Sequence, residues 1–278
     1  MKTINFSIDE LKKRNISEYL IGINIVIFII MFLIDPSFST KTIVKFGAKV
    51  NFLIADGEYY RFITPMFLHL SFYHLGFNCL AIYILGRDIE TIFGKKRFLG
   101  IYFFSGFISS LASFLFNASI SAGASGAVFG LLGSHIFLYF TFKERYKKIY
   151  GNSFLVLIGI NLVFGFISPN IDNVGHLGGL IAGIIVTYAV HIKNHPFDFK
   201  RQLITFLVIP IITLGITFTG ISNYKDSIDY HIYKGLTLIR MESYDQAKEA
   251  IDLGESKYPQ YSDFDYLRDY MSKQINSN

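Results

Sequence analysis

The sequence predicts an all-α protein: a polytopic bundle of membrane helices with a small helical tail outside the membrane. Of its 278 residues, 51% are hydrophobic and only 17% are charged, whereas about 25% of the residues in an average soluble domain are charged. The mean hydropathy is +0.40. Soluble domains of this size have no core large enough for so much apolar surface, so the lipid bilayer must surround much of the chain. These values exclude an ordinary soluble enzyme.

Seven apolar runs can cross a bilayer, at residues 19–34, 66–85, 98–116, 124–142, 154–168, 174–191 and 203–219. A span takes about 20 residues, or about 15 when flanking aromatic side chains complete the length. The first run is followed by Asp35-Pro36-Ser37-Phe38 instead of a small-residue cleavage site, so we expect a retained helix. The predicted domains are an N-terminal segment (1–18), a seven-span membrane domain (19–219) and a helical tail (220–278).

The charges between the runs predict the orientation in the cell membrane. Clusters of Lys and Arg recur in alternate connections, at residues 12–14, 95–97, 143–148 and 193–201. Such clusters mark the cytoplasmic side, so we expect a cytoplasmic N-terminus and, after seven spans, an extracellular tail. The segment 35–61 does not fit this orientation, because it would be extracellular and yet contains Lys41, Lys45 and Lys49. From residue 221 onward the chain contains seven Lys and Arg but ten Asp and Glu. This distribution of charge indicates no nucleic-acid partner.

The tail has the pattern of paired amphipathic helices. Two of them are expected near residues 230–241 and 244–259, with a turn at Glu242-Ser243, and a third near 263–273. The spacing of small and bulky residues resembles one tetratricopeptide repeat; these residues are Gly235, Ala247, Ile251, Gly254 and Pro259. A single repeat is rarely stable alone, so we expect it to pack on the membrane, a protein partner or a second copy. A generic helical hairpin without a binding role is the alternative.

Ser125 and His176 are polar residues at the starts of apolar runs. Ionisable and polar groups at membrane depth are costly and therefore indicate function. Ser125 lies between Gly123 and Gly126, where the free N–H groups of a helix N-terminus stabilise an anion. A serine nucleophile needs a base within hydrogen-bond reach, and His176 enters its helix from the same side. Small residues on both helices would let them approach closely; they are Gly126, Gly130, Gly133, Gly179 and Gly183.

Several motifs occur together along the chain in a characteristic order. They are Gly57–Arg61 ahead of Thr64, then His69, His74 and Asn78, then Gly86, Glu90 and Gly94, then Gly123–Gly126, and last Gly175-His176 with Gly179 and Gly183. In this order the chain resembles the rhomboid intramembrane serine proteases over residues 57–191. A seventh span and a tetratricopeptide-like tail, as in some bacterial members, would be additions to the six-helix core.

The resemblance implies a role for each matching residue. Ser125 would be the nucleophile and His176 the general base. His74 and Asn78, with the backbone N–H groups of Ser125 and Gly126, would hold the oxyanion. Residues expected to give structural support are Arg61, Glu90, Phe129, Gly179 and Gly183. Phe129 stands where most members have a tyrosine, and Tyr60 where they have a tryptophan.

The expected function is hydrolysis of peptide bonds in or next to transmembrane helices, through an acyl-enzyme. Substrates would be single-span or polytopic membrane proteins, and the fifth run would be the gate by resemblance. No cofactor or metal is expected, because Cys79 is the only cysteine and the remaining histidines form no visible ligand set. One alternative is an idle rhomboid-like chaperone or adaptor that recruits clients through its tail. Another is a transporter with His74, His176 and Glu90 as a proton relay.

Overall fold

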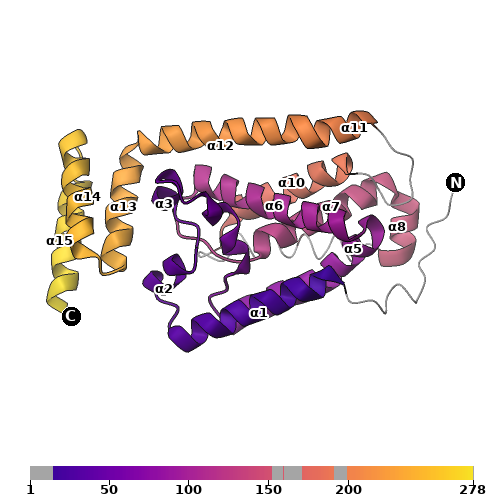
Figure 1. Ribbon diagram of the computed structural model, residues 1–278, viewed down its shortest axis with the longest axis horizontal. Coiled ribbons are helices and arrows are strands. Elements are labelled where there is room, and N and C mark those ends of the chain that lie inside the picture. Colours follow the sequence, from indigo (N-terminus) through magenta and orange to yellow (C-terminus); the bar gives the residue numbers. More distant parts are fainter. Residues whose placement is uncertain (1–14, 152–158, 160–170, 191–198, 278) are drawn as a thin grey trace.

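The structure, a computed structural model, describes residues 15–151, 159, 171–190 and 199–277. Helices α1 (Ile16–Ile34), α6 (Lys95–Phe116), α7 (Ser125–Thr141) and α10 (Asn173–Ala189) form the body of a bundle (Figure 1). Among the described residues, β-type pairing is limited to one isolated bridge between Lys49 and Ser121. The prediction of an all-α bundle is confirmed.

Most of the predicted spans coincide with helices. Helices α1 and α6 are by themselves long and apolar enough to cross a membrane, and α7 and α10 are apolar but shorter. Apart from residue 159, the fifth predicted span (residues 154–168) lies outside the described residues, as does the end of the sixth at His191.

The second apolar run begins later than the sequence predicts. Residues 64–67 form a 3-10 helix, η3 (Thr64–Phe67), and α4 (Phe72–Ala81) starts only at Phe72. The reason is local, because Ser71 Oγ accepts the His74 N–H at 3.1 Å and caps the helix there. Helix α4 continues through a π-turn, η4 (Ile82–Gly86), into α5 (Arg87–Phe93). The helical stretch therefore covers residues 72–93 instead of 66–85.

The connection between α1 and α4, called the outer loop here (residues 35–71), is mostly ordered into short helices. These are α2 (Thr40–Lys45), α3 (Asn51–Ala55), η2 (Tyr59–Phe62) and η3. The loop lies at one end of the bundle, and α8 (Lys143–Tyr150) lies at the other (Figure 1).

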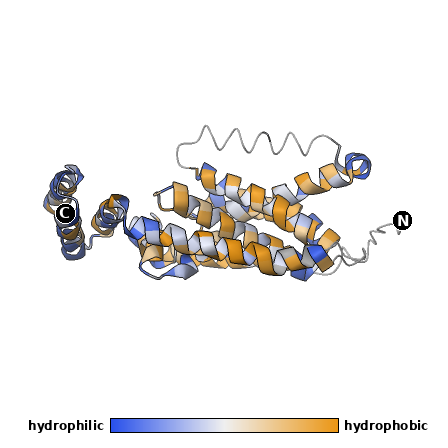
Figure 2. Cartoon of the chain, turned by 90° about the horizontal axis from the view of Figure 1, so that it is seen from above, coloured by the Kyte–Doolittle hydropathy of each residue, from blue (hydrophilic) through white to orange (hydrophobic). Residues whose placement is uncertain are grey.

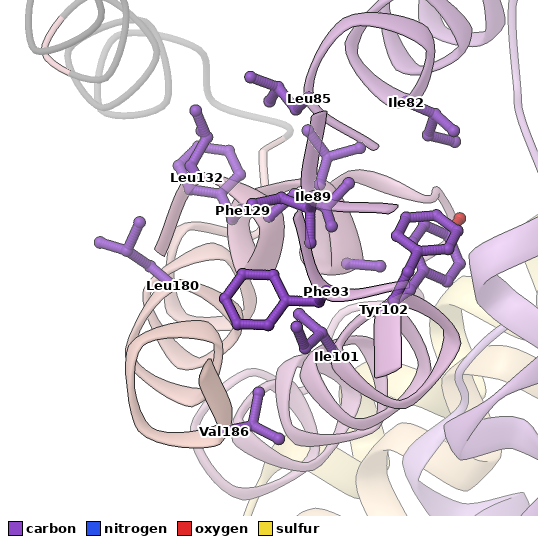
Figure 3. Packing of buried hydrophobic residues seen from close by; sticks show 14 of the residues in the cluster. Ile82, Leu85, Ile89, Phe93, Ile101, Tyr102, Phe129, Leu132, Leu180 and Val186 are labelled. Carbon is purple, nitrogen blue, oxygen red and sulfur yellow. The ribbon is translucent and has the colours of Figure 1, made fainter. Parts of the chain in front are cut away.

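The centre of the bundle is a cluster of aliphatic and aromatic side chains from α4–α7 and α10. Ile82, Leu85, Ile89 and Phe93 point into it from η4 and α5 and meet Tyr102 from α6 (Figure 3). On the other side of the cluster lie Phe129, Leu132, Leu180 and Val186. This packing fixes α7 and α10 against α6, with the starts of α7 and α10 at the outer-loop end.

A long helical stretch follows α10 and runs back along the bundle (Figure 1). It consists of α11 (Phe199–Leu203), a π-turn η5 (Ile204–Val208) and α12 (Ile209–Lys225). Pro210 lies in the first turn of α12, and a π-turn just before it is a way to accommodate the missing N–H. Ile221, near the end of α12, packs with Ile54 and Phe114.

The tail folds into α13 (Ile228–Arg240), α14 (Tyr244–Lys257) and α15 (Asp263–Ser277). The three helices and the turn at Glu242 lie where the sequence predicts them. Figure 2 shows that the tail is more hydrophilic than the bundle. It shares one apolar cluster with the outer loop, in which Val44 and Phe52 meet Leu238 and Ile239.

Candidate active site

Helices α7 and α10 touch through their glycines over three successive turns. A Cβ at Gly179 would lie 2.2 Å from Gly126 O, and one at Gly183 would lie 2.0 Å from Gly130 O. Because Gly126 meets Gly179 and Gly130 meets Gly183, the two helices are parallel. Parallel helices in backbone contact bring their N-terminal ends together, and these ends carry Ser125 and His176.

Ser125 Oγ and His176 Nε2 are 2.7 Å apart, within hydrogen-bond distance. The His176 ring is stacked on Phe129, with ring centroids 4.3 Å apart. Its second nitrogen, Nδ1, is buried and has no hydrogen-bond partner among the described residues. A serine hydroxyl in contact with an imidazole, at a helix start with free N–H groups, is an arrangement suited to nucleophilic attack on a carbonyl.

His74 borders the same space. At Gly123 the backbone has φ of +138°, and a Cβ would lie 2.7 Å from His74 Nε2 and 3.5 Å from Ser125 Oγ. A side chain at Gly123 would be strained and would fill the space between these two polar groups. Asn78 is buried one turn further along α4, where its Nδ2 donates to the His74 carbonyl at 2.8 Å.

Arg61 and Glu90 lie apart from the serine and the histidine. Arg61 is 4% exposed and donates to the carbonyls of Val44 and Ala48, which ties η2 to the rest of the outer loop. Glu90 lies in α5, and its two carboxylate oxygens accept the N–H groups of Ile16 and Ser17 at 2.8 and 3.0 Å. Both oxygens thus cap α1, and no hydrogen bond among the described residues joins Glu90 to His74 or His176.

Sequence reasoning missed three residues at or near this site. His69, which appeared in the order of motifs but was given no role, is fully buried, with its ring edge-on to His74 at 5.0 Å between centroids. Lys49, interpreted as a topology signal, is 0% exposed, with its ammonium group on backbone carbonyls. Asp172 caps α10 by accepting the Gly175 N–H at 3.0 Å. Only Asp172 has a local signal in the sequence, because an aspartate immediately before a helix is a common N-cap.

The fold and the site define a helical membrane protein with a serine and a histidine at two adjacent helix starts. A family model described as the Rhomboid domain matches residues 56–193. The chain is 36% identical over 240 residues to Rhomboid protease GluP of Bacillus subtilis (strain 168), covering 86% of this chain and 47% of that protein. It is 34% identical over 140 residues to Putative rhomboid protease YdcA of the same organism, covering 50% of this chain and 70% of that protein.

A third relative is Rhomboid protease AarA of Providencia stuartii, 25% identical over 257 residues, with 83% of this chain and 89% of that protein covered. The chain belongs to the rhomboid family, and its fold is accordingly that of a multi-pass membrane protein. It spans less than two thirds of several relatives, GluP among them at 47%. The three relatives are described as rhomboid proteases, YdcA as a putative one.

Proposed function

We propose that this chain is an intramembrane serine protease that hydrolyses peptide bonds in or next to the transmembrane helices of membrane-protein substrates. The observation that carries the proposal is the 2.7 Å contact between Ser125 Oγ and His176 Nε2. It joins two helix starts that are 51 residues apart in the sequence. Family membership supports the same chemistry.

In the proposed reaction His176 takes the proton of Ser125 as Oγ attacks the scissile carbonyl carbon. The oxyanion is then bound by His74, by Asn78 and by the backbone N–H groups of Ser125 and Gly126. Asn78 has to turn its amide away from the His74 carbonyl, which it now contacts. One such donor accounts for a factor of about 10²–10³ in rate. His176 protonates the leaving amine as the C–N bond breaks, and water hydrolyses the acyl-enzyme.

The substrate helix must unwind locally, because the amides of an intact helix are neither extended nor accessible. We expect small residues at the cleavage point, by resemblance to the family. The fifth run, proposed as the gate by the same resemblance, lies outside the described residues except for residue 159.

We further infer that the N-terminus is cytoplasmic and that the outer loop, the tail and the site face the other side. The lysines of the outer loop were the objection to this orientation. Lys49 is buried on carbonyls and Lys41 is paired with Glu242 of the tail at 3.2 Å. Because the positive-inside rule counts Lys and Arg and gives acidic partners little weight, these contacts do not remove the objection, and the proposed orientation rests on the larger clusters at residues 12–14, 95–97, 143–148 and 193–201.

We also propose that residues 203–219, within the helical stretch 199–225, are a seventh span and that the tail is a tetratricopeptide-like module for a protein partner. In support of a span, α12 has large apolar side chains exposed, among them Ile211, Ile212 and Phe218. In support of a module, Gly235 and Gly254 lie where α13 and α14 approach their neighbours closely. Truncation after residue 226 tests the module. Loss of cleavage for selected substrates supports a recruiting role, and unchanged cleavage of every substrate contradicts it.

The protease proposal is tested by labelling the purified chain in detergent with a fluorescent serine-directed phosphonate. Wild type is compared with Ser125→Ala and His176→Ala, and with Tyr59→Ala as the control at an exposed aromatic residue of η2. We expect wild type and Tyr59→Ala to be labelled, and the other two not. Labelling without Ser125, or none in folded wild type, would contradict the proposal. The second result would favour the adaptor.

A further inference from the structure

The first turn of α10 is held by a carboxylate that is itself held from another helix. Asp172 Oδ1 accepts the Gly175 N–H at 3.0 Å and the Asn117 Nδ2 at 3.1 Å. Asn117 lies at the end of α6, and Gly175 lies one residue before His176. One oxygen atom thus joins the end of α6 to the start of the helix that carries the histidine.

Asn117 is fixed in turn by the outer loop. Its carbonyl accepts Lys49 Nζ at 2.6 Å and Asn51 Nδ2 at 3.3 Å. Lys49 also donates to Ser119 O at 2.9 Å, so a fully buried ammonium group holds the turn that follows α6. Hydrogen bonds to a charged group are the stronger ones, roughly 1.5–3 kcal/mol each.

The same lysine holds the segment that leads to the serine. The Lys49 N–H donates to Ser121 O at 2.9 Å, and the Ser121 N–H donates to Lys49 O at 3.2 Å. Two residues later, the Gly123 N–H donates to Pro65 O at 2.8 Å. The approaches to Ser125 and to His176 are therefore fixed to a common support.

His176 has few restraints of its own. Its Nδ1 has no partner among the described residues, and the ring is in contact with Ser125 and Phe129. In a Ser-His-Asp triad a carboxylate on Nδ1 fixes the imidazole. Here the acid Asp172 is bonded to the backbone of α10 and not to the ring, so it acts on the position of the ring through that backbone, while Phe129 contacts the ring itself.

We propose that Asp172, held by Asn117, is a positioning residue that sets the distance between His176 and Ser125 through the first turn of α10. This inference rests on the proposed function. Burial raises the pKa of Asp172, but hydrogen bonds, including those from Asn117 and Gly175, and the charge of Lys49 outweigh it, and the pKa lies below its usual value. The Asp172 carboxylate is thus ionised at neutral pH. It acts on His176 only through helix α10.

The test is the kinetics of phosphonate labelling, which separates the binding of the probe from its reaction with serine. We expect Asp172→Ala to lower the maximal labelling rate by roughly tenfold or more, since small misplacements of reacting groups have effects of this size. The probe concentration at half-maximal rate stays unchanged. Asp172→Asn keeps an oxygen for the Gly175 N–H and restores most of the rate.

Asn117→Ala gives the second arm. Because Asn117 acts through Asp172, the double variant Asn117→Ala/Asp172→Ala should react no more slowly than Asp172→Ala alone. Effects on the rate that multiply would mean that Asn117 and Asp172 act on the labelling rate independently and would overturn the proposal. So would a wild-type rate in Asp172→Ala. If Asp172→Ala does not fold, the proposal is tested with Asn117→Ala alone. A maximal labelling rate equal to that of wild type in Asn117→Ala then overturns the proposal.

Ser227→Ala is the matched control, because Ser227 caps α13 in the tail by accepting the Tyr230 N–H. Losing that cap leaves the labelling rate unchanged. The two proposals fail differently. If folded wild type is not labelled, the protease proposal fails, whereas equal labelling of wild type and the Asp172 variants contradicts the positioning role alone.

Discussion

Phe129 lies flat against the imidazole of His176, with 12° between the ring planes and 4.3 Å between the centroids. The two residues belong to different helices, and the contact is one turn below Ser125. Because His176 Nδ1 has no hydrogen-bond partner among the described residues, this aromatic face opposes rotation of the ring.

Replacing Phe129 by leucine should lower the maximal labelling rate by roughly two- to tenfold, because an aromatic stack contributes about 0.5–1.5 kcal/mol. Leucine nearly keeps the volume, so the fold is retained. Phe129→Tyr should react like wild type. The control is Phe137→Leu on the same helix, whose ring packs on Tyr188. A wild-type rate in Phe129→Leu would show that the stack does not restrain the histidine.

Gly183→Ala should separate α7 from α10, because its Cβ would lie 2.0 Å from Gly130 O. Neither backbone can move aside without breaking other contacts, so we expect a lower melting temperature and little labelling. Gly100→Ala is the control, since its Cβ would meet nothing within 4 Å. It should be as stable as wild type or more stable, because alanine favours a helix by about 1 kcal/mol. Equal melting temperatures for the two variants would contradict the close contact.

Glu90→Ala should destabilise the chain without slowing the chemistry. It leaves the N–H groups of Ile16 and Ser17 buried without their acceptor, at a cost of about 1–3 kcal/mol. Thermal unfolding measures the loss, and Glu144→Ala on the exposed side of α8 is the control. The labelling rate of the folded fraction should equal that of wild type. A slower rate would give Glu90 a part in the reaction.

Acid should weaken the tail through His231, which is buried in α13. Burial and the charges of Lys257 and Lys234 hold its pKa below the usual 6.5. The unfolded tail therefore takes up a proton first, and the free energy of unfolding of the tail decreases as the pH falls below 6.5. We expect faster proteolysis within α13–α15 at about pH 5 than at about pH 7.5, and a smaller difference in His231→Gln. The same difference in both proteins would contradict this assignment.

The sequence was sufficient for the elements that depend on local pattern. Apolar runs predicted α1, α6, α7 and α10, and amphipathic spacing predicted the three tail helices. The predicted start of α4 was wrong, because the cap by Ser71 determines where the helix begins. Counting apolar residues over 66–71 does not detect the single hydrogen bond that makes this cap. The order of motifs indicated that Ser125 and His176 form a pair. Their role in catalysis remains a prediction.

The supporting residues could not be predicted because their partners are far away in the sequence. Lys49 and Asn117 are 68 residues apart, and Asn117 and Asp172 are 55 residues apart. A lysine in a loop has the same local pattern whether it is solvated or buried on carbonyls. Counting Lys49 as a surface charge was therefore reasonable from the sequence and wrong in the structure.

The shared cluster of the outer loop and the tail also fixes an order of assembly. Lys41 pairs with Glu242 across 201 residues, and Lys234 pairs with Asp56 across 178. A nascent chain has made the outer loop long before these partners leave the ribosome, and domains generally fold as they are synthesised. The apolar face of α2 and α3 must therefore remain uncovered during most of translation. Closure of this end of the molecule therefore has to follow the synthesis of the tail.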